Sequence, residues 1–117
     1  MVDGPLVLAP EREGRLEMRS PLIVGPGAAG YGRELAKLLP LASLGAFITT
    51  TTTLHARRGQ APPRLIETPA GYITSTGLPN PGLRTALHRH APAWLRMGTP
   101  VILSVAAEVA RTFAYCV

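Results

Sequence analysis

Three short apolar runs constrain the fold of this chain more than any other feature of its sequence. Residues 21–24, 45–49 and 100–105 are apolar along almost their whole length and do not alternate with charged residues. A strand with this pattern is buried on both faces, as in parallel sheets covered by helices. Helical patterns separate and follow the runs, and this order is typical of βαβ units. We therefore predict an α/β fold.

The predicted helices occupy three segments of the sequence. Residues 32–39 place their leucines on one face and end at Pro40, which cannot continue a helix. Residues 83–97 have a helical pattern that Pro92 is expected to interrupt. The last helix is predicted over residues 106–114.

The remaining segments are predicted to be hairpins and loops. Residues 6–8 and 16–18 flank a polar stretch and predict a short antiparallel hairpin. Residues 55–63 are rich in Arg, Gly and Pro and predict a loop. A short extended segment is expected within residues 65–72, and residues 77–82 form a predicted turn cluster.

The composition suits one small domain. The chain has 117 residues, of which 46% are hydrophobic, so it can bury a core. The net charge of +5 comes from eleven Arg and one Lys that are scattered along the chain and not interleaved with aromatic residues. This scatter argues against a nucleic-acid partner, which needs a basic patch with stacking platforms.

The remaining composition features predict a cytoplasmic location. A single cysteine, Cys116, excludes an internal disulfide. Asp3, Glu11 and Glu13 stand where a signal peptide would need an apolar core, so none is expected. No apolar run approaches the ~18 residues that a membrane span requires.

A glycine motif follows the first apolar run. Gly25, Gly27 and Gly30 match G-x-G-x-x-G between a predicted strand and a predicted helix, where glycines let a backbone approach a pyrophosphate. The dinucleotide form of the motif also needs an acidic residue after the second strand, but residues 46–53 contain none. The alternative, an ordinary glycine-rich loop, is favoured, and a small nucleotide-binding domain stays open.

Five threonines, 49–53, end the second apolar run. Ligands bind at the carboxyl ends of strands in α/β proteins, so these hydroxyls are candidate ligand contacts, although threonine also has a high strand propensity. His88 and His90 are two residues apart and would lie on different faces of a helix, as a solvated pair, and His55 has no partner in the sequence. No metal site or hydrolase triad is predicted.

Several segments together resemble the class 1 dihydroorotate dehydrogenases, in particular the type that works with a separate electron-transfer subunit. The similarity runs from about Leu16 to Ala107. Its most specific parts are the two loop segments with the sequences PPRLIETPAG and GLPNPG. The segments that carry the resemblance are 20–24, 29–35, 44–48, 62–71, 77–82, 94–95 and 100–102.

The resemblance implies a fold and an activity. The family is a (β/α)₈ TIM barrel that holds FMN at the carboxyl ends of its strands and oxidises dihydroorotate to orotate in pyrimidine (UMP) biosynthesis. A whole barrel needs ~250 residues, so residues 1–117 are expected to be a single partial domain with about three strands. An oxidoreductase acting on a CH–CH bond is therefore implied, inactive as an isolated chain, with an electron-transfer subunit or a barrel-completing chain as its partner.

The resemblance also implies site residues. The expected cofactor contacts to FMN are Gly25, Pro26, Gly27, Thr50, Thr51 and Ser104. The expected substrate contacts to a dihydroorotate-like molecule are Thr50, Thr74, Ser75, Thr76, Gly77 and Leu78. The cysteine that acts as base in this class would lie beyond Val117, and Cys116 is not its counterpart.

Four of these positions depart from the family pattern. Pro26 replaces a serine, Thr50 a lysine, Thr74 an asparagine and Ser104 an asparagine. A neutral threonine cannot supply the positive charge that a lysine offers to flavin and substrate. A non-catalytic remnant or partner-dependent binding module is therefore an alternative to the enzyme. Unpaired strand edges predict that the isolated chain aggregates or needs a partner.

Overall fold

The structure is a computed structural model that describes residues 6–8 and 13–117. The prediction that no signal peptide is present depends mainly on residues outside these ranges. The strands are β1 (Leu6–Leu8), β2 (Leu16–Met18), β3 (Ile23–Val24), β4 (Ala46–Ile48), β5 (Leu65–Thr68), β6 (Gly71–Thr74) and β7 (Val101–Ile102). The helices are α1 (Leu83–Trp94) and α2 (Ala110–Ala114), and the 3₁₀ turns are Leu35–Lys37 and Leu41–Ser43.

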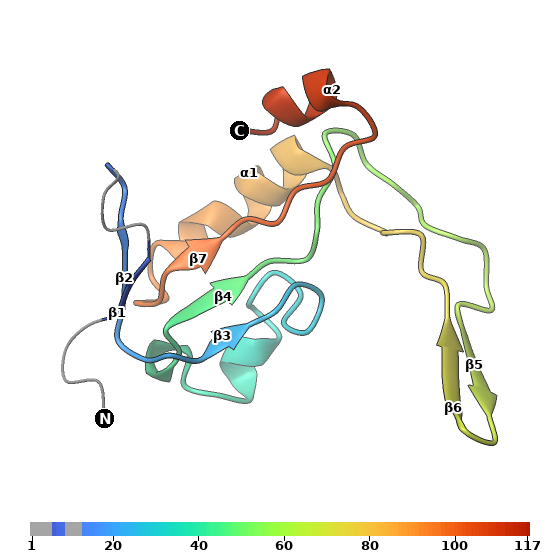
Figure 1. Cartoon of the computed structure of the whole chain (residues 1–117), viewed down its shortest axis with the longest axis horizontal. Coiled ribbons are helices and arrows are strands. Elements are labelled where there is room, and N and C mark those ends of the chain that lie inside the picture. Colours follow the sequence, from blue (N-terminus) through green and yellow to red (C-terminus); the bar gives the residue numbers. More distant parts are fainter. Residues whose placement is uncertain (1–5, 9–12) are drawn as a thin grey trace.

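The three predicted apolar strands form one parallel sheet in the order β3-β4-β7 (Figure 1). Val24 is paired with Phe47, and Phe47 with Val101. The mixed α/β class is therefore confirmed. The prediction that all three strands are buried on both faces is wrong, because Ile23 on the edge strand β3 is 40% exposed. Only the central strand has the two covered faces that its sequence predicted.

The core lies around β4. Ala46 and Phe47 are fully buried, and Ala86 of α1 is fully buried as well. Gly45 precedes β4 and donates its N–H to the Leu22 carbonyl at 2.9 Å. A Cβ at Gly45 would overlap the Ser20 carbonyl oxygen, so the close approach of the chain before β3 to β4 depends on this glycine.

The first predicted helix is much shorter than expected. Within residues 32–39 only the turn Leu35–Lys37 is helical, and Leu38 and Leu39 are exposed instead of forming a buried face. Gly30 and Gly32 have φ of 56° and 92°, values that right-handed helices exclude. Because these glycines delay the start of the helix and Pro40 ends it, only one turn fits.

The other helical predictions also need correction. Pro92 does not interrupt α1, because it lies inside the helix near its end at Trp94. The last helix does not begin at residue 106. Ala106 instead donates its N–H to the Thr52 carbonyl at 3.0 Å, which extends the sheet beyond β7, and α2 begins only after the extended Val109.

Two antiparallel hairpins lie outside the three-stranded sheet. β1 and β2 pair as predicted. The short extended segment predicted within residues 65–72, around 69–71, is wrong in its place: Pro69 and Ala70 form the turn of a hairpin between β5 and β6. Residues 77–82 are not a turn cluster. Their backbone is irregular, with a bridge between Arg57 and Asn80.

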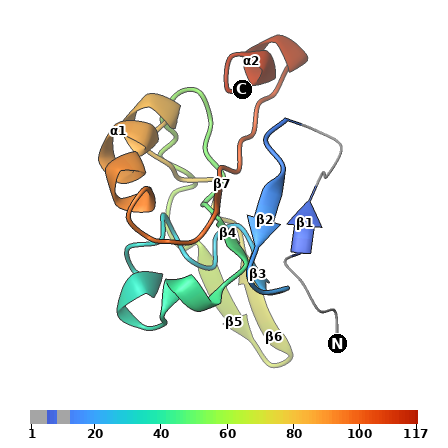
Figure 2. The same ribbon diagram turned by 90° about the vertical axis from the view of Figure 1, so that its left-hand side faces the viewer.

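The β5–β6 hairpin stands away from the three-stranded sheet, whereas α1 and the β1–β2 hairpin lie on opposite sides of that sheet (Figures 1 and 2). The radius of gyration is 16.3 Å, compared with about 13 Å for a compact chain of this length. Within the described residues, neither helix is long or apolar enough to cross a membrane.

Candidate functional site

Hydroxyl groups gather where the parallel strands end. Thr51 follows β4 and Ser104 follows β7, and their side-chain oxygens share a hydrogen bond of 2.9 Å. Ser104 also donates its N–H to the Thr49 hydroxyl oxygen at 3.1 Å. The parallel pairing of β4 and β7 brings these residues together, because it aligns the carboxyl ends of both strands. Two of the predicted flavin contacts are thus neighbours.

The glycine loop after β3 meets the threonine run through the backbone. Thr50 donates its N–H to the Gly30 carbonyl at 2.8 Å. Gly25, Pro26 and Gly27 are exposed at the start of this loop. Gly27 has φ of 89°, which a residue with a side chain rarely adopts, and an added Cβ there would meet nothing within 4 Å. This part of the loop is therefore open to solvent.

Thr50 offers hydroxyl chemistry only. Its carbonyl oxygen accepts hydrogen bonds from the Thr49 and Thr52 hydroxyls at 3.2 and 2.9 Å, which fixes the backbone of the run. The residues gathered at this edge, Thr50, Thr51 and Ser104, are all neutral. The site can donate and accept hydrogen bonds, but these residues supply no charge.

Tyr31 links the glycine loop to both the threonine run and α1. Its hydroxyl shares a hydrogen bond of 2.9 Å with the Thr52 hydroxyl, and its carbonyl accepts one of 2.9 Å from Trp94 Nε1. Its ring stacks on the ring of His90 with centroids 4.4 Å apart and an angle of 9°. The predicted solvated histidine pair is therefore wrong in part: His88 is exposed, but His90 is packed.

Burial lowers the pKa of His90 below its usual value, and the charges of Arg33 and Arg89 lower it further. Glu34 acts in the opposite direction. His90 Nδ1 is buried and has no hydrogen-bond partner among the described residues. The neutral form of this histidine is therefore favoured in the folded chain.

Asn80 joins the end of β4 to the start of α1. Its Oδ1 accepts the N–H groups of Thr53 and Gly82 at 3.2 and 2.9 Å. Its Nδ2 donates to the Thr53 hydroxyl at 3.0 Å and to the Leu78 carbonyl at 2.9 Å. The residue is only 7% exposed, so its amide group is buried and fully bonded.

The predicted substrate residues do not form one cluster. Thr74 ends β6, which belongs to the hairpin that stands away from the sheet in Figure 1. The Thr74 hydroxyl donates to the Arg64 carbonyl at 3.2 Å. Ser75 donates its N–H to the same carbonyl at 3.0 Å. Thr50 lies beyond the carboxyl end of the central strand β4, so the structure does not bring it together with Thr74.

The rest of the predicted substrate loop lies between hairpin and helix. Thr76 accepts the Gln60 N–H at 2.9 Å. Gly77 has φ of 68°, and a Cβ there would come within 2.7 Å of Gln60 N, so only glycine fits. Leu78 has φ of 57°, which is unusual for a residue with a side chain.

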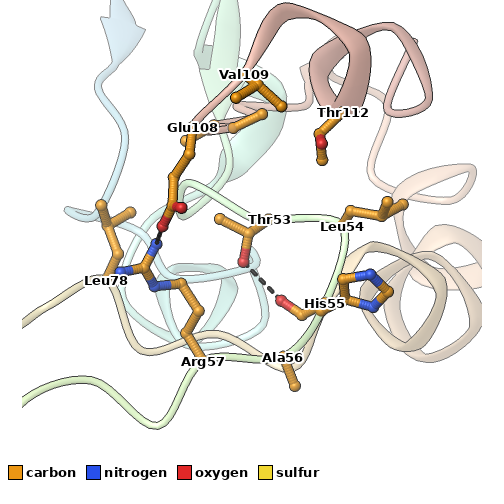
Figure 3. A pocket seen from close by; sticks show the side chains of 11 residues that line it. Thr53, Leu54, His55, Ala56, Arg57, Leu78, Glu108, Val109 and Thr112 are labelled. Atoms are coloured by element: carbon orange, nitrogen blue, oxygen red, sulfur yellow. Dashed lines mark hydrogen bonds and ion pairs between the residues drawn. The ribbon is translucent and has the colours of Figure 1, made fainter.

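A hollow in the described part of the chain lies beside this loop and not at the hydroxyl cluster. It is an open cavity of about 540 Å³, and Leu78 is the one predicted site residue that lines it (Figure 3). Arg57 and Glu108 form an ion pair of 3.4 Å across it. The cavity is lined by Thr53, Leu54, His55, Ala56, Arg57, Leu78, Ala106, Ala107, Glu108, Val109 and Thr112. In residues 6–8 and 13–117, no three His, Cys, Asp or Glu side chains group as metal ligands.

The fold is a parallel sheet with polar side chains at the carboxyl ends of its strands. In α/β proteins of this class, ligands bind at those ends. The family model for dihydroorotate dehydrogenase matches residues 14–117. The chain belongs to the dihydroorotate dehydrogenase family.

Curated relatives agree with this assignment. The chain is 41% identical over 99 residues to the catalytic subunit of dihydroorotate dehydrogenase B (NAD(+)) from Desulforudis audaxviator, covering 85% of this chain and 32% of the relative. It is 34% identical over 102 residues to the corresponding subunit from Thermoanaerobacter pseudethanolicus, with coverage of 87% and 34%. For Bacillus pumilus the identity is 41% over 93 residues, with coverage of 80% and 30%. The chain spans about a third of the length of these relatives.

Sequence reasoning missed the contacts of Tyr31, Asn80 and His90. A signal existed for the histidine, since His90 and Trp94 are four residues apart and share one face of a helix. Nothing in the sequence indicated that Asn80 would bond Thr53, which is distant along the chain.

Proposed function

We propose that residues 1–117 are one partial domain, the amino-terminal part of a TIM barrel that acts as an FMN-dependent dihydroorotate dehydrogenase. Family membership and the hydroxyl cluster at the carboxyl ends of the parallel strands β4 and β7 support this proposal. In such barrels the ligand site is built from the loops that follow the strands. The substrate would be dihydroorotate or a close relative, oxidised at a CH–CH bond.

One observation carries the proposal: the 2.9 Å hydrogen bond between Thr51 and Ser104. These two half-buried hydroxyls meet beyond the carboxyl ends of the neighbouring strands β4 and β7. Hydroxyls can donate to and accept from the polar edge of a flavin ring system. Gly25, Pro26 and Gly27 are exposed directly after β3, and Gly30 of the same loop accepts the Thr50 N–H.

These residues fit the ring of FMN better than its phosphate. The donor set contains neutral hydroxyls and backbone groups, which suit a ring edge, whereas a phosphate prefers cations and clustered N–H groups. We infer that Thr51 and Ser104 hold the ring edge and that Gly25 and Gly27 border it. FMN would supply the acceptor for the hydride that leaves the substrate, and the phosphate would be held by strands beyond the described sheet.

The substrate contacts are proposed to come from two places. Thr50 would contribute a hydroxyl at the sheet edge. The other contacts would come from the end of β6 and the segment that follows it, if this part of the chain closes over the site as loops do in many enzymes. They are Thr74, Ser75, Thr76, Gly77 and Leu78. Strain at Leu78, with φ of 57°, is the observation that favours such a movable segment.

The proposed partners follow from the relatives. Their names describe the catalytic subunit of an NAD(+)-dependent enzyme, which implies a separate subunit for electron transfer. We propose that this chain also docks the strands that close the barrel. In the described residues, β3 and β7 each have a free edge that could pair with a further parallel strand.

The flavin proposal is tested in an assembly that closes the barrel. The chain is produced together with the remaining two-thirds of the Desulforudis audaxviator subunit, and bound FMN is titrated by quenching of flavin fluorescence. Thr51→Val and Ser104→Ala are each expected to weaken FMN binding about 2- to 10-fold, the value of one hydrogen bond. Thr68→Val, in the distant hairpin, is the matched control and should bind as the parent does. Equal affinity for all four proteins would overturn the flavin contacts.

A second function, a non-catalytic binding module, is favoured by one observation. The site edge presents the neutral Thr50 where the family pattern has a lysine. This module would bind FMN in the same assembly but would not transfer hydride. The alternative of a small nucleotide-binding domain is not supported by the local structure. Such a domain needs a helix directly after the Gly25–Gly30 loop to face a pyrophosphate, and only the turn Leu35–Lys37 follows it.

A further inference from the structure

An aromatic stack connects the glycine loop after β3 to helix α1. His90 lies between Tyr31 and Trp94, with ring centroids 4.4 and 6.2 Å away. Tyr31 comes from the glycine loop, whereas His90 and Trp94 lie one turn apart on α1. The stack therefore joins the loop that borders the proposed flavin site to the helix behind it.

The stack is connected to the threonine run by a direct hydrogen bond. The Tyr31 hydroxyl bonds to the Thr52 hydroxyl at 2.9 Å, and Thr52 in turn donates to the Thr50 carbonyl at 2.9 Å. Thr52 is fully buried. Movement of the Tyr31 ring would release Thr52 and, through it, the backbone at Thr50.

The surroundings of His90 oppose a positive charge. Arg33 from the loop and Arg89 from α1 are cations near the ring, and Glu34 is the opposing carboxylate. Protonation would also turn the buried Nδ1 into a donor without an acceptor among the described residues. A charged His90 would therefore leave the stack more readily than a neutral one.

We propose that His90 is a positioning residue that couples its own protonation to the placement of the threonine run at the flavin site. With His90 neutral, the stack holds Tyr31 and thereby Thr52. With His90 protonated, the stack opens and the run loses its anchor. The role of the run in flavin binding rests on the proposed function, but the coupling itself is a property of the chain.

Trp94 gives a direct readout, because it is the one tryptophan of the chain. The full chain is titrated from pH 8 to pH 5 at submicromolar concentration while Trp94 emission is recorded. When the contact with Tyr31 opens, His90 still lies one turn from Trp94 on α1, and a protonated imidazole quenches a neighbouring indole. Because the pKa of His90 is lowered, Trp94 emission should fall as the pH drops below about 6.5. His90→Phe, which keeps a stacking ring and cannot titrate, should abolish the step.

His88→Gln is the matched control, since His88 is exposed on the same helix. Its emission step should be that of the parent chain. His90→Gln serves as a second variant if the phenylalanine does not fit, and it should also remove the step. A flat titration of the parent, or a step that survives in both His90 variants, would overturn the proposal.

Hydrogen exchange tests the coupling to residues 49–53. After correction for the intrinsic effect of pH, their protection should fall across the emission step in the parent and stay constant in His90→Phe. Tyr31→Phe, which keeps the ring but removes the hydroxyl, should lower their protection about 2- to 10-fold at pH 8, the value of one hydrogen bond. If the protection of residues 49–53 changes neither with pH nor in Tyr31→Phe, the coupling is contradicted. None of these readouts needs flavin, so their outcome is separate from that of the FMN titration.

Discussion

In the proposed site, the charge of the residue at position 50 would decide which ligands bind beside the carboxyl ends of the strands. The residues gathered there, Thr50, Thr51 and Ser104, are neutral, whereas an orotate-like ligand carries a carboxylate. A lysine at position 50 would add a charge-assisted hydrogen bond of about 1.5 to 3 kcal/mol. We expect Thr50→Lys to strengthen orotate binding about 10- to 100-fold in the FMN-loaded assembly, measured by calorimetry.

Thr68→Lys adds the same charge in the β5–β6 hairpin, away from the sheet, and is the control for the change in net charge. Its orotate affinity should be that of the parent. If both lysine variants gain equally, the attraction is non-specific and Thr50 does not face the ligand.

Among the polar side chains, we expect the removal of Asn80 to lower the free energy of unfolding most. Asn80→Ala would leave the N–H groups of Thr53 and Gly82 without their acceptor in a buried place. We expect a loss of about 2 to 4 kcal/mol in unfolding free energy, measured by urea denaturation at submicromolar concentration with Trp94 as the probe. Thr74→Ala, an exposed position with one hydrogen bond, should change it little. Equal losses in the two variants would contradict the role of Asn80.

At the scale of elements, the contact between β4 and the segment before β3 depends on the absence of a side chain at Gly45. Gly45→Ala would push a Cβ onto the Ser20 backbone, and we expect a loss of about 1 to 3 kcal/mol, the usual cost of overpacking. Gly25→Ala is the matched control, because nothing lies within 4 Å of a Cβ there. Thermal melts of the two variants compare them directly, and a Gly45→Ala chain as stable as the control would refute the close approach.

The sequence was sufficient to predict the sheet, because the apolar runs are local signals. β4 follows its run closely, and the pairing of β3, β4 and β7 is parallel as expected. The helices were harder to predict, because their limits depend on backbone geometry. Positive φ at Gly30 and Gly32 shortened the first, and the sheet bond of Ala106 delayed the last.

The candidate site was predictable only where strand ends meet. Thr51 and Ser104 follow neighbouring strands, so their contact follows from the topology. The family resemblance predicts that Thr74 lies near Thr50. The position of Thr74 depends instead on the register between β5 and β6, which has no clear signal in the sequence. The stack on His90 depends on how α1 packs against the glycine loop, a long-range contact without a strong local signal.

At the scale of the whole molecule, apolar side chains remain exposed on the β5–β6 hairpin. Ile66 and Ile73 form a cross-strand pair and are 51% and 62% exposed. A two-stranded hairpin is marginal in water by itself, and strand edges invite association. We expect sedimentation velocity to show self-association of the isolated chain at micromolar concentration.

The double variant Ile66→Ser, Ile73→Ser should reduce that self-association, because it removes the apolar pair without touching the sheet. A double variant at Arg84→Ser and Arg111→Ser, both exposed on the helices, is the control and should associate as the parent does. A parent chain that is a monodisperse monomer with a cooperative melt would contradict the expectation that it needs a partner.

We infer that this chain supplies the amino-terminal part of a working flavin site. Dihydroorotate is added anaerobically to the FMN-loaded assembly while the visible absorption of the flavin is recorded. We expect the flavin to be bleached, and the bleaching to be slower when Thr51→Val or Ser104→Ala is present. An assembly that holds FMN but is not bleached, even with Thr50→Lys, would contradict the dehydrogenase and leave the binding module.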